Sequence, residues 1–175
     1  MEGSFVPECY FDTVLVRAIL QTDKVINHQK GCNNVINVMK EGRLSDAFAV
    51  GIVDKDKKEL DYLKEFEKYD FDNLVLHKHQ NKHHYVIQLN PPIEKWIINV
   101  ASEAKIDIIK FGLPKEVDRL RKITKSELAK ESPELVSLCL ALVQSDSSTI
   151  RRLKSWIIYL RDNRYKSDIK YLTNG

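Results

Sequence analysis

Residues 47–58 read Ala-Phe-Ala-Val-Gly-Ile-Val-Asp-Lys-Asp-Lys-Lys, a continuous apolar run that ends abruptly in alternating acidic and basic residues. An uninterrupted run of this length is typical of a strand buried on both faces of a sheet. Open α/β sheets bind their ligands just beyond the carboxyl ends of the strands. Asp54 and Asp56 therefore mark a candidate site, although the same residues could simply begin an acidic loop that caps a helix at Glu59.

Strands and helices are predicted to alternate on both sides of this run. The expected strands span residues 4–7, 24–28, 47–53, 73–77 and 84–89. The expected helices span residues 12–19, 31–42, 59–68, 93–101, 114–124, 132–144 and 146–163. The early alternation predicts an α/β fold with a mainly parallel, Rossmann-like sheet flanked by helices. We expect an α/β domain over residues 1–110 and a helical C-terminal region over 111–175 packed on it.

Positive charge is concentrated in the helical part. The chain has a net charge of +3, which divides into +5 for residues 114–175 and −2 for residues 1–113. Arg151, Arg152 and Lys154 lie on the last predicted long helix. That helix is either an ordinary solvated face or a surface that contacts a phosphate backbone without reading sequence.

Composition narrows the class of protein. With 175 residues, 43% of them hydrophobic and 30% charged, the chain has enough apolar surface for a real core and is not of the disordered class. No apolar stretch is long enough for a transmembrane helix, and the N-terminus does not resemble a signal peptide. Three widely spaced cysteines favour reduced thiols and a cytoplasmic location. Motifs of nucleotide hydrolysis and acyl transfer do not occur.

Three segments, in order, resemble the toprim domain, and among its members the small RloB-like and overcoming-lysogenization nucleases. The first is Glu8-Cys9-Tyr10-Phe11-Asp12, the second is Val53-Asp54-Lys55-Asp56, and the third is Leu89-Asn90-Pro91-Pro92-Ile93-Glu94-Lys95-Trp96-Ile97. Cys9 departs from the pattern, because a glycine usually follows the glutamate. The resemblance covers roughly residues 3–101.

The resemblance implies a metal-dependent nuclease. Mg²⁺ or Mn²⁺ would be held by Glu8, Asp54 and Asp56, the expected catalytic residues, with Glu94 as a further ligand and Asp12 behind them. It also suggests a role in defence against foreign DNA.

Other functions stay open beside it. Lys55, Lys57 and Lys58 either hold the scissile phosphate or only balance charge. The alternatives are a non-catalytic relative that binds nucleic acid (DNA or RNA) or a partner protein, which could be a second copy of the chain, and an enzyme acting on a small phosphate compound. A membrane is not expected as a partner.

Histidines cluster between the last two predicted strands, at His77, His79, His83 and His84. They could form a Zn²⁺ or Mn²⁺ site, contact phosphate, or belong to a polar, solvated hairpin turn. Trp96 and Trp156 are predicted to anchor the core.

Overall fold

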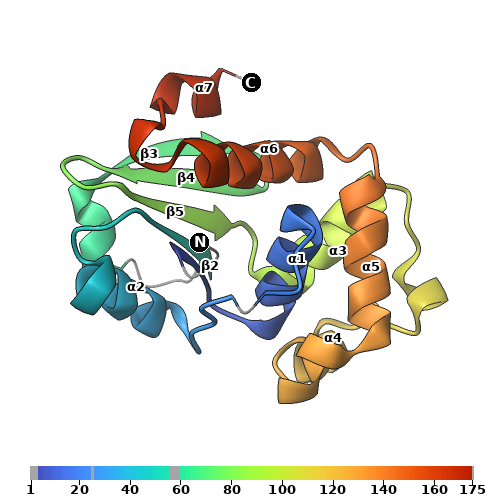
Figure 1. The fold of residues 1–175 in the computed structure, drawn as a ribbon. Coiled ribbons are helices and arrows are strands. Elements are labelled where there is room, and N and C mark those ends of the chain that lie inside the picture. Colours follow the sequence, from blue (N-terminus) through green and yellow to red (C-terminus); the bar gives the residue numbers. More distant parts are fainter. Residues whose placement is uncertain (1–3, 25, 56–59, 175) are drawn as a thin grey trace.

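The computed structural model describes residues 4–24, 26–55 and 60–174 (Figure 1). Within them lies a five-stranded sheet with the order β1-β2-β5-β4-β3. The strands are β1 (Phe5–Pro7), β2 (Ala49–Asp54), β3 (Phe66–Phe71), β4 (Leu74–His79) and β5 (His84–Leu89). β2 pairs in parallel with both β1 and β5. β4 pairs antiparallel with both β5 and β3. The fold is therefore α/β with a mixed sheet.

Helices cover both faces of the sheet. They are α1 (Tyr10–Leu20), α2 (Cys32–Lys40), α3 (Ile93–Glu103), α4 (Val117–Thr124), α5 (Pro133–Gln144), α6 (Ser148–Asn163) and α7 (Ile169–Thr173). On one face, α2 packs in a smaller hydrophobic cluster with β2. On the other face, α1, α3, α5 and α6 share one core with β2, β4 and β5. Figure 1 shows α6 lying along the sheet, with α7 beyond it.

The central strand is β2, which forms because its apolar run faces a helical layer on each side. Val50 and Ile52 belong to the larger core, whereas Ala49 and Val53 belong to the cluster beneath α2. Gly51 lets α2 approach closely: a Cβ at this position would lie 2.8 Å from the Met39 sulfur. Any larger residue at this position would push the helix away from the strand.

The sheet corrects the prediction of a mainly parallel architecture, and two predicted elements explain why. Residues 24–28 form no strand where the structure describes them. The predicted helix at 59–68 is instead a 3₁₀ turn, Asp61–Glu65, followed by the antiparallel strand β3. The predicted strand at 24–28 and the predicted crossover helix at 59–68 are thus missing from the described residues, and β3 and β4 form a hairpin. The prediction of an α/β fold with flanking helices is confirmed.

The remaining elements lie close to their predicted positions. α5 begins where Ser132 caps it and Pro133 opens its first turn, and Ser147 caps α6 by accepting from Ile150 N–H at 3.1 Å. Trp96 and Trp156 are buried core residues, as predicted. Among the described residues, no helix combines the length and the apolar character needed to cross a bilayer.

Candidate active site

Acidic side chains meet at one edge of the sheet. Glu8 follows β1, Asp54 ends β2, and Glu94 lies in the first turn of α3, shortly after β5. Because β1, β2 and β5 are adjacent and parallel, their carboxyl ends share this edge. Asp12, in the first turn of α1, completes the group. We call Glu8, Asp12 and Asp54 the carboxylate rim.

Glu8 is held in a fixed orientation by two donors. Its Oε2 atom accepts a hydrogen bond from the backbone N–H of Asp54 at 2.9 Å. The same oxygen accepts from the Cys32 thiol at 2.8 Å. Both contacts engage one oxygen and bring the side chain onto the end of β2.

Asp12 is buried in spite of its charge. Its Oδ2 atom accepts from the backbone N–H of Cys9 at 3.2 Å, and Cys9 Sγ accepts in turn from the N–H of Asp12 at 3.3 Å, which forms a capping box. Its Oδ1 atom is buried and has no hydrogen-bond partner among the described residues. Burial raises the pKa of Asp12 well above its ordinary value, and the charges of Asp54 and Glu8 raise it further.

The conformation of Cys9 shows why this position, a glycine in the toprim pattern, can hold another residue. Its backbone is extended, with φ −123° and ψ 169°, a conformation open to any residue. Its thiol also takes the place of the usual hydroxyl in the cap. No glycine is required at this turn.

Asp54 is the second carboxyl group of the rim with a raised pKa. Burial raises its pKa to about 7, the charges of Glu8 and Glu94 add to the rise, and the backbone N–H of Ile93 and the ammonium of Lys125 oppose it. Its Oδ1 atom is buried and, within the described part of the chain, lacks a hydrogen-bond partner. Leaving a buried acceptor unsatisfied costs about 1–3 kcal/mol. A bound cation is one kind of partner that would satisfy such an atom.

Glu94 is buried beside Asp54 but has partners of its own. Thr124 Oγ1 donates to its Oε1 at 3.1 Å, and Arg121 Nε lies 3.7 Å from its Oε2. Both partners come from α4, so this carboxylate also ties α4 to α3. These contacts give Glu94 a structural role, and its role as a metal ligand stays a prediction.

Three helices begin at the carboxylate rim. Cys9 caps α1, α2 starts at Cys32, and α3 starts at Ile93. Each helix N-terminus carries a partial positive charge and free backbone N–H groups. They offset part of the repulsion among the acids and favour a bound anion such as phosphate.

Several predicted residues cannot be placed. Asp56, Lys57 and Lys58 lie outside the described residues. Lys55 is described: its N–H donates to the carbonyl of Leu89 at 2.9 Å, which continues the β2–β5 pairing to the rim. Among the described side chains, no three His, Cys, Asp or Glu residues are grouped to hold one metal ion. This statement does not extend to the predicted ligand Asp56, which lies outside the described residues.

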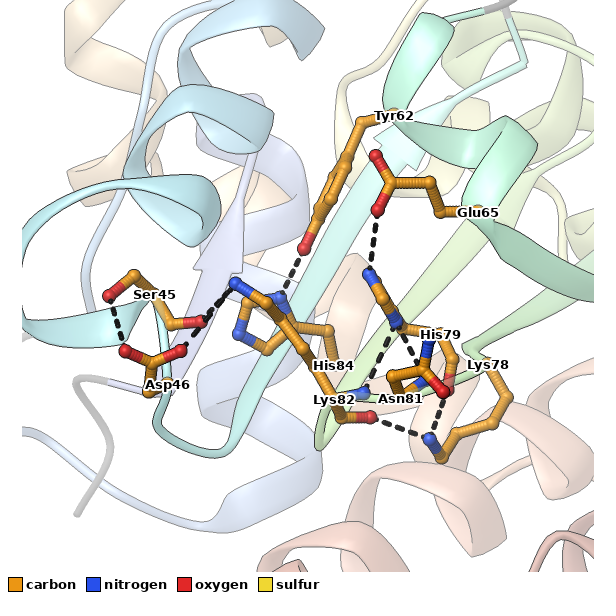
Figure 2. A network of polar contacts seen from close by, with 9 residues as sticks. All are labelled: Ser45, Asp46, Tyr62, Glu65, Lys78, His79, Asn81, Lys82 and His84. Atoms are coloured by element: carbon orange, nitrogen blue, oxygen red, sulfur yellow. Dashed lines mark hydrogen bonds and ion pairs between the residues drawn. The ribbon is translucent and has the colours of Figure 1, made fainter.

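The histidines form a different arrangement (Figure 2). His84 Nε2 donates to the carbonyl of Leu44 and its Nδ1 accepts from Tyr62, both at 2.8 Å. His79 Nδ1 accepts from the N–H groups of Asn81 and Lys82, so Nε2 faces Glu65 at 3.2 Å as a donor. We call the nine residues of Figure 2 the histidine network: Ser45, Asp46, Tyr62, Glu65, Lys78, His79, Asn81, Lys82 and His84.

This arrangement favours the hairpin interpretation but corrects its solvated character. His77, His79 and His84 are buried, and only His83 is exposed, against Tyr165. Burial lowers the pKa of His79 and of His84 below the ordinary value of histidine. Both ring nitrogens of His79 and of His84 are already engaged, which leaves neither available to zinc.

The basic residues of the last long helix lie on α6. Arg151 is exposed, Lys154 is half-buried, and the Arg152 guanidinium lies 4.3 Å from the centre of the Phe71 ring. Sequence reasoning missed Cys32, Arg121, Thr124 and Lys125 near the acids. Cys32 had only its place after Gly31 to indicate it, and Arg121, Thr124 and Lys125, which lie in α4 or directly after it, are far from the acids in sequence.

Comparisons of the chain with protein-family models, with curated proteins and with solved structures find no match.

Proposed function

We propose that this protein is a divalent-metal-dependent, toprim-like nuclease that cleaves phosphodiester bonds of nucleic acid. The observation that supports it most is that Asp12 and Asp54 each have a buried carboxylate oxygen with no hydrogen-bond partner among the described residues. Burial, and after it the charges of Glu8 and Glu94, raise the pKa of Asp54 to about 7. A hard divalent cation would satisfy the Asp54 oxygen and would offset the repulsion among the carboxylates.

Glu8 and Asp54 would hold the metal, with Asp56 as the third expected ligand. Because Oε2 of Glu8 is engaged by Cys32 and Asp54, its other oxygen is the one left for a metal. Mg²⁺ or Mn²⁺ would supply an activated water and stabilise the charge of the leaving oxygen. Asp12 would act from behind, as a neutral or charged acceptor that positions Cys9 and the start of α1.

Cations and helix N-termini would hold the phosphate. Lys125 lies close enough to lower the pKa of Asp54, and Lys55 follows it directly in the chain. The N–H groups at the start of α2 and α3 face the same rim. These groups would orient a phosphodiester over the carboxylates. Their positive charge would offset the repulsion between the phosphate and the carboxylates.

The second candidate is a binding protein that does not cleave, and the contacts of Glu94 favour it. Thr124 and Arg121 engage both oxygens of Glu94, as in a structural ion pair. Such a protein would use the same fold to bind nucleic acid or a partner protein. Defence against foreign DNA, as the nuclease resemblance suggests, is compatible with both candidates.

Cleavage assays distinguish the two candidates. Purified protein is incubated with plasmid DNA and with RNA, in Mn²⁺, in Mg²⁺ and in EDTA. We expect metal-dependent cleavage that Asp54→Asn lowers at least a hundredfold, since one such residue typically supplies that much of the rate. Asp61→Asn makes the same change on an exposed side chain and should leave the rate unaltered. Cleavage at the parent rate by Asp54→Asn would refute the assignment, and binding without cleavage by the parent would favour the second candidate.

A further inference from the structure

A groove follows the outer side of α6 and is closed on one side by α7. It consists of two adjoining hollows with volumes of about 330 and 400 Å³, which share Arg151, Ser155 and Tyr171. We call it the α6–α7 groove. The Trp156 indole N–H donates to the carbonyl of Leu172 at 2.7 Å, which fastens α7 against α6.

The groove displays a prearranged aromatic pair. Tyr159 and Tyr171 stack with ring centroids 4.2 Å apart and planes 15° from parallel. Tyr171 is 59% exposed, although burial of a tyrosine ring is favourable. Tyr159 is held in place because its hydroxyl accepts from the N–H of Asp168 at 3.0 Å. An ordered, exposed aromatic surface of this kind lets a flat ring stack on it with little loss of side-chain entropy.

Positive charge lines the same groove. Arg151, Arg152 and Lys154 contribute three cations. Among the described residues that line it, the one acidic side chain is Asp162, which is paired with Arg161 at 2.7 Å. Toward β3 the next hollow contains Asp70 and Asp72, so the basic stretch ends there. The groove is therefore complementary to a phosphate chain of limited length.

We infer that the α6–α7 groove binds single-stranded nucleic acid. Cations beside an aromatic platform match a strand whose bases are free to stack, because each base offers a flat face and each phosphate a charge. In a duplex the faces of the bases are already stacked on each other. The 16 residues of α6 extend about 24 Å, enough for a few nucleotides. The inference rests on the proposed function in one respect: it names the strandedness of the substrate that the proposed nuclease would cleave.

Binding measured without metal tests this inference separately from cleavage. Fluorescence anisotropy in EDTA and low salt would follow labelled dT12, its RNA equivalent U12, and a duplex of the same length. We expect the single strands to bind at least tenfold more tightly than the duplex. Tyr171→Ala should weaken single-strand binding about tenfold, which is within the range for loss of one base stack. Tyr171→Phe keeps the ring and should stay within twofold of the parent.

Charge reversal supplies a second, matched pair of variants. Arg151→Glu should weaken binding more than tenfold and reduce its dependence on salt, whereas Lys110→Glu, the same kind of change on an exposed residue of another segment, should not. Retained folding is checked by circular dichroism. A parent that binds no single strand, prefers duplex, or responds equally to Arg151→Glu and Lys110→Glu would overturn the inference. Metal-dependent cleavage by such a parent would leave the proposed function standing, and single-strand binding without cleavage would leave only the inference standing.

Discussion

The carboxylate rim and the histidine network both contain buried titratable side chains, but they differ in how the polar atoms of these side chains are satisfied. In the histidine network, each ring nitrogen of His79 and His84 has a partner, and burial lowers the pKa of both rings. In the carboxylate rim, Asp12 and Asp54 each keep a buried oxygen without a partner among the described residues. Burial and mutual repulsion raise the pKa values of both acids.

We interpret this difference as one between a structural group and the group that we propose to be functional. A satisfied buried network stabilises one packing of the elements that it joins, here β4, β5 and the turn before β2 (Figure 2). An unsatisfied buried group lowers stability, and proteins keep such groups at sites where a ligand completes them. Substitutions in the two groups should therefore change stability in opposite directions.

The largest effect on stability is expected from His84→Ala. The fully buried His84 joins Tyr62 to the carbonyl of Leu44, so truncation leaves a cavity and two unpaired polar groups. We expect the free energy of unfolding in urea to fall by about 2–4 kcal/mol. An unchanged midpoint would mean that the histidine network does not support the fold.

Metal binding should raise the stability of the protein through the carboxylate rim alone. At a hundredfold excess over its Kd, an ion that binds only the folded state adds about 2.7 kcal/mol of stability. For a chain of this size, this raises Tm by about 5–10 °C. We expect such a rise with Mn²⁺ for the parent, and little rise for Asp54→Asn combined with Asp56→Asn. Equal shifts in both proteins would place the ion elsewhere.

In the absence of metal, the dependence of stability on pH should further distinguish the carboxylate rim from the histidine network. Folded Asp54 has a pKa of about 7, above that of the unfolded chain, so the folded state binds the extra proton between pH 4 and 7. Its contribution to stability is therefore present at low pH and is lost as pH rises through this window. Asp54→Asn removes the loss, and we expect it to be the more stable protein by about 1–2 kcal/mol at pH 8 and equal to the parent near pH 4. A variant less stable than the parent at pH 8 would contradict the electrostatic interpretation.

A smaller change is expected from Tyr62→Phe. It removes the hydroxyl that donates to His84 and keeps the ring that packs on Phe66. We expect a loss of about 1 kcal/mol, the usual net contribution of one hydrogen bond. The rate of any metal-dependent cleavage should be unchanged, because this residue belongs to the histidine network. A loss of cleavage without a loss of stability would show that the two groups are coupled.

Strong local signals in the sequence predicted the elements of the fold that frame the candidate site. The apolar run of β2 and the serine caps of α5 and α6 were visible in consecutive residues. The strand β3 was missed because Leu60, Leu63 and Phe66 match a helical spacing as well as a turn that leads into an edge strand. Pairing with β4 decides between the two, and pairing is a tertiary interaction.

The same limit applies to the candidate site. Glu8 and Asp54 could be proposed because each follows a predicted strand. The hydrogen bond from the Cys32 thiol to Glu8 joins residues 24 positions apart, and the one from Thr124 to Glu94 joins residues 30 positions apart. No local sequence pattern predicts either contact. The burial of His77, His79 and His84 was likewise hidden in a stretch that is polar in composition.

The most direct test of the carboxylate rim as a metal site is anomalous diffraction from crystals of the protein soaked in Mn²⁺. We predict a strong anomalous peak at the carboxyl ends of β1 and β2, about 2–2.5 Å from oxygens of Glu8 and Asp54. The peak should disappear in Asp54→Asn crystals soaked in the same way. A saturating soak that leaves these carboxylates without a peak, or that places manganese only at the histidine network, would contradict the assignment.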